Sequence, residues 1–384
     1  MLFSNRIPND LTPNLLSSSY QVHQDTLLDM TISNPTLCGF KYPRSFFESL
    51  LTGNVEKYSP NSQGLLIARE AVSQDLQRQG LSISPENIFL TSGTSEAYSY
   101  LFKLLCDPGD SVLFPSPGYP LIEHLAQAES LEALPYWLIP RTNGAVDFDS
   151  FGLSNPEKVK AIVGIHPHNP LGTYLSHDDL ARMDDWCSQR GAALLLDEVF
   201  WDYAWDEPPT RPSFEPKSLT VHLGGLSKSV GLPQLKCSWF ALRGPKELLE
   251  HARIRLDFLL DLYLSVGSPV QNALPLILRN GSVIQDQILK RIKSNRHHLE
   301  EIAPTWNGRI HLVPSQAAWA SILEVTNPTL DEETYTMELL ESGVYVMPGY
   351  FFSLDGGVHF VISLLIQEAD FQKGLSILTS YFTK

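Results

Sequence analysis

The chain has 384 residues, of which 43% are hydrophobic and 18% charged, a composition typical of a globular protein with a buried core and unlike that of a disordered chain. The 43 acidic side chains outnumber the 28 basic ones, and the net charge of −15 disfavours nucleic acid and anionic membrane surfaces as partners. The apolar runs are too short to span a bilayer and the polar N-terminus lacks the apolar centre of a signal peptide, so we expect a cytoplasmic protein.

Short apolar runs alternate with helical patterns from about Glu70 onward. The runs are Ile88 to Leu90, Ser111 to Phe114, Ala161 to Ile165, Ala192 to Leu196, Leu219 to Leu223 and Ser238 to Leu242. This alternation predicts an α/β fold in which crossover helices join the strands of a mostly parallel sheet.

After about Pro275 the pattern changes. A long helical stretch reaches Glu301, and strand-like runs follow at residues 310–313, 318–325 and 357–363 before a closing helical segment. We therefore expect a large domain over residues 46–280 and a smaller α+β domain made of residues 1–45 and 281–384.

The segment LTSGTSEAYSYLFKLL, residues 90–105, is typical of a strand, a tight polar turn and a helix. The start of such a helix offers free backbone N–H groups and the positive end of the helix dipole, next to Gly93 and the hydroxyls of Ser92, Thr94 and Ser95. This turn can hold a phosphate. The same hydroxyls also serve as ordinary helix caps, so the motif alone leaves both interpretations open.

Two proline-containing turns follow later strands. FPSPGYPLIEH, residues 114–124, places Tyr119 where its ring can stack on a planar cofactor or serve as a core aromatic. HPHNPLG, residues 166–172, places Asn169 at a strand end, where its amide can donate to a phenolate oxygen.

No metal site is predicted. His166 and His168 have no carboxylate or thiolate nearby at a familiar ligand spacing. The cysteines show no CxxC spacing, so neither a zinc site nor a disulfide framework is indicated. They are Cys38, Cys106, Cys187 and Cys237.

The strand-like run AALLLDEV, residues 192–199, ends in Asp197. Because the carboxyl ends of parallel strands face the ligand crevice, Asp197 can hold a cation such as a protonated ring nitrogen; the alternative is a helix cap or a surface acid. Lys228 lies between an apolar run and a glycine-containing turn, in HLGGLSKSVGLPQLK. It can be a nucleophilic amine with a lowered pKa, or an ordinary solvated lysine.

Together, these motifs resemble those of the fold-type I pyridoxal-phosphate enzymes of the aspartate aminotransferase family, over nearly the whole chain. The motifs are YSPNSQG from Tyr58, TSGTSEA from Thr91, PSPGY ending at Tyr119, HNPLG with Asn169, LLLDEV with Asp197, and GLSKSVGLPQLK with Lys228. The resemblance implies the fold type I architecture, with a mostly parallel, seven-stranded sheet in the large domain.

The resemblance also implies roles for individual residues. Lys228 is expected to form the Schiff base with pyridoxal 5′-phosphate and then to move a proton, and Asp197 to pair with the ring nitrogen. Asn169 is expected to bond the ring oxygen, and Tyr119 to stack on the ring. The remaining cofactor-binding residues are expected to be Gly93, Thr94, Ser95, Phe200, Ser227, Lys236 and Tyr58. Because Tyr58 would reach the phosphate of a second subunit, a homodimer with shared active sites is implied.

Four positions depart from the family pattern. Val361, in FVISLL, stands where the family has the arginine that binds the substrate α-carboxylate, and Phe200 replaces a tyrosine that bonds the ring oxygen. Gly225 replaces a serine, and Lys236 replaces the arginine that binds the phosphate, which keeps the charge but loses the bidentate fork.

The missing carboxylate contact costs on the order of 1.5–3 kcal/mol for an ordinary amino acid substrate. Either another cation, such as Arg44, Arg296 or a partner-subunit residue, replaces it, or the substrate has no free α-carboxylate there. We expect an aminotransferase-like enzyme acting on an unusual small-molecule amino substrate. The alternatives are an enzyme of the same fold that catalyses elimination, replacement, cyclisation or decarboxylation, and a catalytically silent protein that binds the cofactor.

Overall fold

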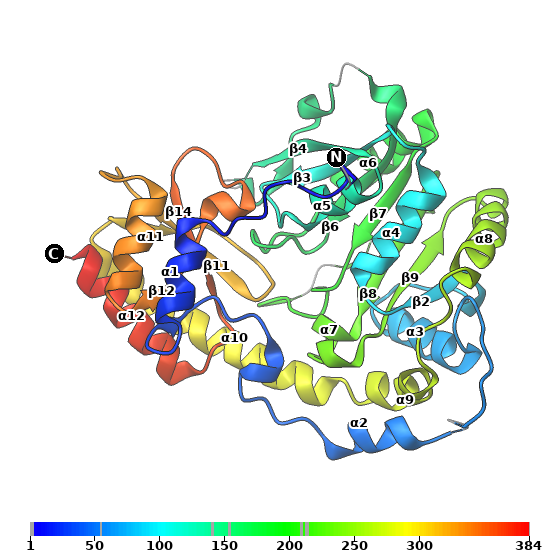
Figure 1. Ribbon diagram of the computed structural model, residues 1–384, viewed down its shortest axis with the longest axis horizontal. Coiled ribbons are helices and arrows are strands. Elements are labelled where there is room, and N and C mark those ends of the chain that lie inside the picture. The colour runs from blue at the N-terminus through cyan, green and yellow to red at the C-terminus, as the bar shows by residue number, and fades with distance from the viewer. Residues whose placement is uncertain are drawn as a thin grey trace.

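The computed structural model describes residues 4–53, 56–139, 142–152, 155–207, 210–211 and 215–383. Its centre is a sheet of eight strands in the order β2-β9-β8-β7-β6-β3-β4-β5 (Figure 1). The strands are β2 (Ile88–Thr91), β3 (Ser111–Ser116), β4 (Glu132–Ile139), β5 (Ala145–Val146), β6 (Val159–Ile165), β7 (Ala193–Asp197), β8 (Leu219–Gly225) and β9 (Ser238–Arg243). The four pairings from β8 to β4 are parallel, which confirms the predicted α/β fold.

The edge strands β4 and β5 are absent from the sequence-based prediction. Pro135 interrupts the β4 segment and argues against a central strand, because proline cannot donate a hydrogen bond to a neighbouring strand. The structure accommodates this proline because β5 pairs only with Leu138 and Ile139, so that β4 is the sheet edge at Pro135. Without the two-residue strand β5, the sheet has the expected seven strands.

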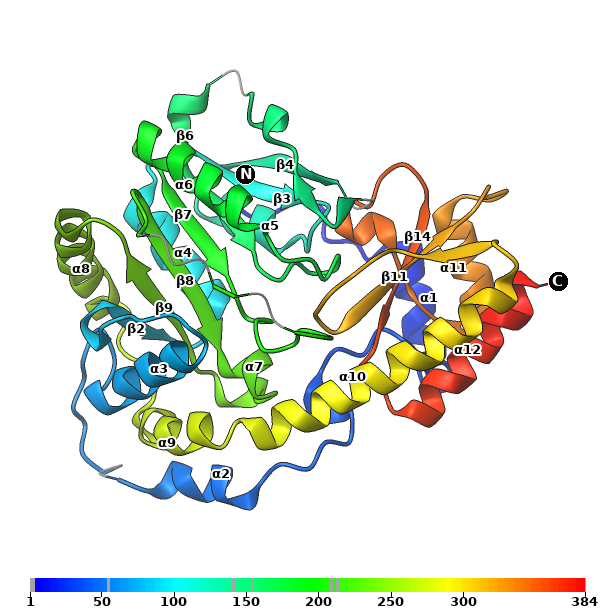
Figure 2. The ribbon, with the colours of Figure 1, turned by 180° about the vertical axis from the view of Figure 1, so that it is seen from behind.

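Helices cover both faces of the sheet (Figure 2). One face packs against α4 (Thr94–Leu105), α5 (Leu121–Ala128) and α8 (Lys246–Asp261). The other packs against α3 (Leu66–Arg78) and α6 (His177–Arg190). Along β7, Ala193 and Leu195 face the first layer while Leu194 and Leu196 face the second, as the two-residue period of a strand requires. Burial on both faces explains the continuous apolar run ALLL.

A second sheet has the order β10-β11-β14-β13 and is antiparallel. Its strands are β10 (Ile310–Leu312), β11 (Ala320–Val325), β13 (Met347–Pro348) and β14 (Val358–Ser363). Around it lie α10 (Ser282–Ile302), α11 (Glu332–Glu341) and α12 (Glu368–Phe382) (Figure 2). The N-terminal segment contributes α1 (Leu15–His23), α2 (Arg44–Glu48) and β1 (Leu28–Asp29), which pairs with β12 (Val344–Tyr345). The exact limits of the two domains stay a prediction.

The predicted long helix after Pro275 is two helices, α9 (Ser268–Arg279) and α10. The break falls at Asn280 and Gly281. The Asn280 side chain donates to Leu276 O over 2.8 Å, which caps the end of α9. A Cβ at Gly281 would lie 2.6 Å from Val230 Cγ1, so only glycine fits this close contact. No helix in the described ranges has the length and apolar character needed to cross a membrane.

Candidate active site

Four of the predicted site residues lie at or just after the carboxyl ends of adjacent strands. Tyr119 follows β3, Asn169 follows β6, Asp197 ends β7, and Lys228 lies on the one-turn helix α7 (Leu226–Ser229) that follows β8. The register pairs Ile165 with Asp197, which brings the ends of β6 and β7 to one level. The parallel topology therefore gathers these side chains at one edge of the sheet.

Asp197 is held by two hydrogen bonds. The Tyr98 hydroxyl donates to Oδ2 over 3.0 Å and the Val199 N–H donates to Oδ1 over 3.2 Å. Burial raises the pKa of Asp197 to about 6, while these bonds and the charge of Lys228 act in the opposite direction. Above pH 6 the group is a carboxylate in a poorly solvated place, which suits it to hold a protonated nitrogen.

Lys228 is partly buried in an aromatic environment. Its Nζ lies 5.0 Å from the centre of the Trp319 ring and 5.5 Å from that of Phe200. Burial lowers the pKa of this amine and the charge of Asp197 raises it. A lowered pKa increases the fraction of neutral, nucleophilic amine, and the remaining exposure leaves Lys228 accessible to a ligand.

Tyr203 fixes the backbone that carries Lys228. Its hydroxyl lies 2.8 Å from Lys228 O and 3.0 Å from Ser229 O, so its single hydrogen is shared between these two carbonyl groups at the end of α7. The preceding Ser227 is partly buried on the same short helix.

The first turn of α4 provides the candidate phosphate site. Gly93 is the residue before the helix and makes no side-chain cap, and a Cβ placed there would meet nothing within 4 Å. Glu96 accepts hydrogen bonds from the Ser92 amide and hydroxyl, so Ser92 is engaged within the turn. The groups that remain for an anion are the amides and hydroxyls of Thr94 and Ser95.

Lys236 is exposed and, with Ser92, lines a cavity of about 530 Å³ that also includes Tyr263 and Leu264. The departure at Gly225 has a packing reason, because a Cβ there would lie 2.3 Å from Ser238 Oγ. A serine at 225 therefore does not fit beside Ser238.

Tyr119 and Asn169 complete the group. Phe352 positions the turn that carries Tyr119. The Gly118 N–H donates to Phe352 O over 2.8 Å, and the centres of the Tyr119 and Phe352 rings lie 6.2 Å apart. Tyr119 is 52% exposed. Asn169 is partly buried, and within the described ranges no residue is hydrogen bonded to its side-chain amide.

Val361 belongs to an apolar cluster. Val361 lies on β14 and is opposite Ile322 and Met347 in the neighbouring strands. The same cluster includes Phe352, whose ring lies near that of Tyr119, and Leu171, which is two residues after Asn169. Neither arginine suggested as a replacement has an ion pair with this region. Arg44 is exposed and pairs with Glu48 over 2.9 Å.

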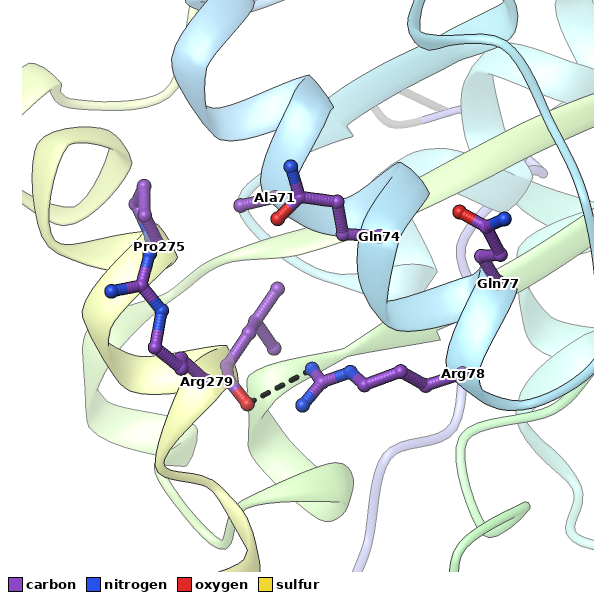
Figure 3. A pocket seen from close by; sticks show the side chains of 7 residues that line it. Ala71, Gln74, Gln77, Arg78, Pro275 and Arg279 are labelled. Atoms are coloured by element: carbon purple, nitrogen blue, oxygen red, sulfur yellow. Dashed lines mark hydrogen bonds between the residues drawn. The ribbon is translucent and has the colours of Figure 1, made fainter.

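Arg296 pairs with Glu300 over 2.7 Å and lies over the Trp205 ring. Tyr58 is 76% exposed and lies outside the group at the strand ends. The groove drawn in Figure 3 lies between α3 and α9 and is lined by none of the predicted site residues.

Three residues of the site escape prediction from sequence. Tyr98 and Trp319 stand in ordinary apolar patterns, and Tyr203 lies three residues after Phe200 with no motif around it. The one available signal is the position of Tyr98, one turn after Thr94, which places it above the candidate phosphate turn on α4.

The family model of aminotransferase class I and II matches residues 43–373. The chain belongs to this family. Nicotianamine aminotransferase 1 of Oryza sativa subsp. japonica is 30% identical over 256 residues, which are 64% of this chain and 50% of that protein. S-alkyl-thiohydroximate lyase SUR1 of Arabidopsis thaliana is 28% identical over 65% of this chain and 55% of its own length. The chain thus spans about half the length of these relatives.

Solved structures of the family share the fold. An alanine aminotransferase from Pyrococcus furiosus superimposes with a TM-score of 0.85 at 21% identity, over 95% of each chain. A Thermus thermophilus aspartate aminotransferase double mutant has a TM-score of 0.85 at 21% identity over 98% of this chain and 99% of its own. The fold type I expectation is therefore confirmed.

Members of the class I and II family use pyridoxal phosphate, and the residues present here fit this cofactor. The donor set comprises an accessible amine with a lowered pKa, a partly buried carboxylate, a helix start without a side-chain cap, and the Asn169 amide, which is unpaired among the described residues. The open space at Gly93 leaves room for a phosphate.

Proposed function

We propose that this chain is a pyridoxal-phosphate-dependent enzyme that transforms a small amino-group substrate, with Lys228 as the residue that bonds the cofactor. The observation that carries the proposal is the placement of Lys228 and Asp197 at the carboxyl ends of neighbouring strands. Asp197 ends β7 and Lys228 lies on α7, just after the neighbouring strand β8; each charge influences the pKa of the other, and both keep some exposure. An amine and a carboxylate so placed can hold the two ends of one planar ring.

When bound, pyridoxal phosphate supplies an aldehyde that condenses with amines and a ring that withdraws electrons from the adjacent carbon. The carboxylate of Asp197 would hold the proton of the ring nitrogen, and the Asn169 amide would donate to the ring oxygen. The Tyr119 ring would stack on the cofactor. Once displaced by substrate, Lys228 Nζ would take and return the proton of the substrate carbon.

The substrate is proposed to present no free carboxylate at Val361. The side chains of Val361, Ile322 and Phe352 are apolar and carry no hydrogen-bond donor for a carboxylate, whose burial without a partner is costly. An amine, an amino ester or an amino amide suits such a wall better. Turnover of a panel of amino acids, their amides and the corresponding amines tests this, and a clear preference for free amino acids would contradict it.

Transamination is the first candidate reaction, because the amine, the carboxylate and the amide are all retained. The similarity to a protein named as a lyase, together with Val361 and Phe200, supports non-transaminating chemistry as the second. A transaminase converts its cofactor to pyridoxamine phosphate and releases a carbonyl product, whereas a lyase, cyclase or decarboxylase restores the starting absorbance. A silent binding protein shows no spectral change with any donor.

We further propose a homodimer with shared active sites. Apolar side chains on and after α8 are strongly exposed, among them Ile254 (70%), Phe258 (71%) and Leu264 (63%). Leu264 lines the same cavity as Lys236, so an interface there would lie beside the candidate phosphate site. A Phe258→Asp variant should sediment as a monomer.

Sharing of the sites has its own test. Mixing Tyr58→Ala and Lys228→Ala chains should restore activity, because one site of the mixed dimer receives both wild-type residues. Recovery of no activity from a mixture that forms dimers would contradict a role of Tyr58 across the interface.

The central experiment is the absorbance of the purified protein with pyridoxal phosphate, followed by borohydride reduction and peptide mass analysis. We expect visible absorbance and a reduced cofactor on Lys228. The Lys228→Ala variant should show neither. Attachment to another lysine, or full turnover by Lys228→Ala without added amine, would refute the assignment.

A further inference from the structure

Ser238, the first residue of β9, is a buried residue whose hydroxyl makes no hydrogen bond to any described residue. The residue is 2% exposed. Among the described residues no donor or acceptor is hydrogen bonded to its Oγ, whereas the equally buried Ser218 hydroxyl donates to Asp184 over 2.6 Å. The Oγ of Ser238 is not fully enclosed by the protein, so this unpartnered hydroxyl can be reached by a ligand.

The strand register determines which way Ser238 faces. Phe89, Phe240 and Leu223 are paired across β2, β9 and β8, and all three pack on the sheet face that α4 covers. Two residues further along, the same register pairs Thr91 with Ser238 and Ser238 with Gly225. Because side chains alternate along a strand, Ser238 also faces the α4 side.

On that side Ser238 lies at the level where α4 begins. Thr91 is the last residue of β2, its Oγ1 donates to Gly93 O over 3.1 Å, and the helix starts at Thr94. Ser238, paired with Thr91, is therefore next to the turn whose free amides form the candidate phosphate site.

Gly225 makes the position of Ser238 possible. Its missing side chain leaves room for the Ser238 side chain, since a Cβ at 225 would lie 2.3 Å from Oγ and 2.8 Å from Cβ of Ser238. The two residues thus compete for one space at the start of α7. The hydroxyl in that space belongs to Ser238 on β9, whereas a serine at position 225 would provide it from β8.

We propose that Ser238 Oγ donates a hydrogen bond to the phosphate group held at the start of α4, an inference that rests on the proposed function. This hydroxyl has no hydrogen-bond partner in the part of the chain that the structure describes, faces that helix and occupies the space left free by Gly225. It adds a neutral donor to a site whose only proposed cation, Lys236, is exposed.

The test compares dissociation constants for three probes: pyridoxal phosphate, pyridoxal and inorganic phosphate. Ser238→Ala should weaken pyridoxal phosphate binding roughly ten- to hundredfold, the effect of one hydrogen bond to a charged group. Inorganic phosphate should also bind more weakly, whereas pyridoxal, which has no phosphate, should bind as to wild type. The control is Ser111→Ala. Ser111 has a buried hydroxyl at the start of β3, whereas the candidate site lies beyond the carboxyl end of that strand, so this variant should change none of the three dissociation constants.

An exchange variant sharpens the test. Gly225→Ser alone should destabilise the apoprotein because it clashes with Ser238. The double variant Gly225→Ser with Ser238→Gly returns one hydroxyl to the same space and should recover most of the phosphate-dependent affinity. Thermal unfolding of each apoprotein separates effects on the fold from effects on the ligand.

Equal weakening of pyridoxal and pyridoxal phosphate, or wild-type affinities in Ser238→Ala, would overturn the role of Ser238 and leave the proposed function intact. A wild-type protein that binds inorganic phosphate in a Ser238-dependent way but takes up no pyridoxal phosphate would overturn the proposed function instead. Failure of the wild type to bind any of the three probes would overturn both.

Discussion

Tyr98 donates a hydrogen bond to Asp197 from the second turn of α4, across 3.0 Å, although 99 positions separate the two residues in the chain. The helix that begins at the candidate phosphate site thus also holds the carboxylate proposed for the other end of the cofactor ring. Any change in the seating of α4 on the sheet would move both groups together.

Tyr98→Phe should destabilise the apoprotein more at pH 8 than at pH 5. Because the pKa of Asp197 is about 6, the bond lost at pH 8 is to a carboxylate, and that lost at pH 5 is to a neutral acid. We expect losses of about 1.5–3 kcal/mol at pH 8 and about 1 kcal/mol at pH 5. Urea unfolding at both pH values measures them.

Tyr136→Phe is the matched control. Tyr136 is also fully buried, but its hydroxyl donates to the Val163 carbonyl, which does not titrate in this range. Its loss should be the same at both pH values. A Tyr98→Phe loss that is equally independent of pH would contradict the coupling to Asp197.

In Asp197→Asn the free energy of unfolding of the apoprotein should fall less between pH 4 and pH 8 than it does in wild type. The variant should also lose activity. The folded pKa of Asp197, about 6, exceeds its ordinary value of 3.8, so the folded state binds more protons between these values and wild-type stability falls as pH rises through this window. Asparagine removes that fall, a relative gain of about 1–3 kcal/mol. Denaturation across pH 4 to 8 checks it; parallel wild-type and variant curves would refute it.

Arg211→Met should cost about 3–5 kcal/mol of stability at pH 7, because it leaves a buried carboxylate without its main partner. Arg211 and Glu198 are 2.5 Å apart with side chains only 4% and 5% exposed, and His222 Nδ1 lies 3.2 Å from the other carboxylate oxygen. Burial opposes ionisation of Glu198, but Arg211 and His222 outweigh it and hold its pKa well below the usual range. The pair therefore stabilises the fold above the ordinary pKa of glutamate and loses that effect as pH falls.

Adding Glu198→Gln to Arg211→Met should return part of the lost stability, since no unpaired charge remains. Arg44→Met is the control, because the exposed pair of Arg44 with Glu48 contributes at most about 1 kcal/mol. Chemical denaturation of the wild type, the single variants Arg211→Met and Glu198→Gln, and the double variant gives the coupling, and strictly additive losses would contradict it.

His166→Asn should reduce the loss of stability in acid. Burial lowers the pKa of His166 from 6.5 to about 4, so the unfolded chain binds more protons between these values, and wild-type stability falls as pH drops from 6.5 to 4. The expected difference is about 3 kcal/mol. Asparagine keeps an acceptor for the Leu175 N–H that now bonds His166 Nδ1.

His124 is exposed, so His124→Asn serves as the control for this change and should leave the pH profile of unfolding as in wild type. If both variants follow the wild-type profile below pH 6.5, His166 is not the source of the acid sensitivity.

The sequence alone was enough for the class of fold and for the strand-end residues. Asp197, Asn169 and Lys228 each lie at or after the end of an apolar strand. A pattern of this kind depends only on neighbouring residues in the chain, so it can be recognised without knowing how the elements pack. The departures from the family pattern that the sequence indicates at Val361, Phe200 and Gly225 stay predictions. The sequence-based prediction missed β4, because Pro135 argues against a strand unless the partner strand is known to be short. It also joined α9 to α10, because the contact of Gly281 with Val230 is between residues far apart in the chain and cannot be read from the sequence.

Only the tertiary structure decided which side chains meet. The bond from Tyr98 to Asp197, the rings of Trp319 and Phe200 beside Lys228, and the space shared by Gly225 and Ser238 all depend on strand register and on how the helices and the second sheet pack. Periodicity determines the face on which a residue lies, since it is a property of neighbours in the chain. The identity of the residue opposite is set by contacts between distant segments, which form only when the whole core is assembled.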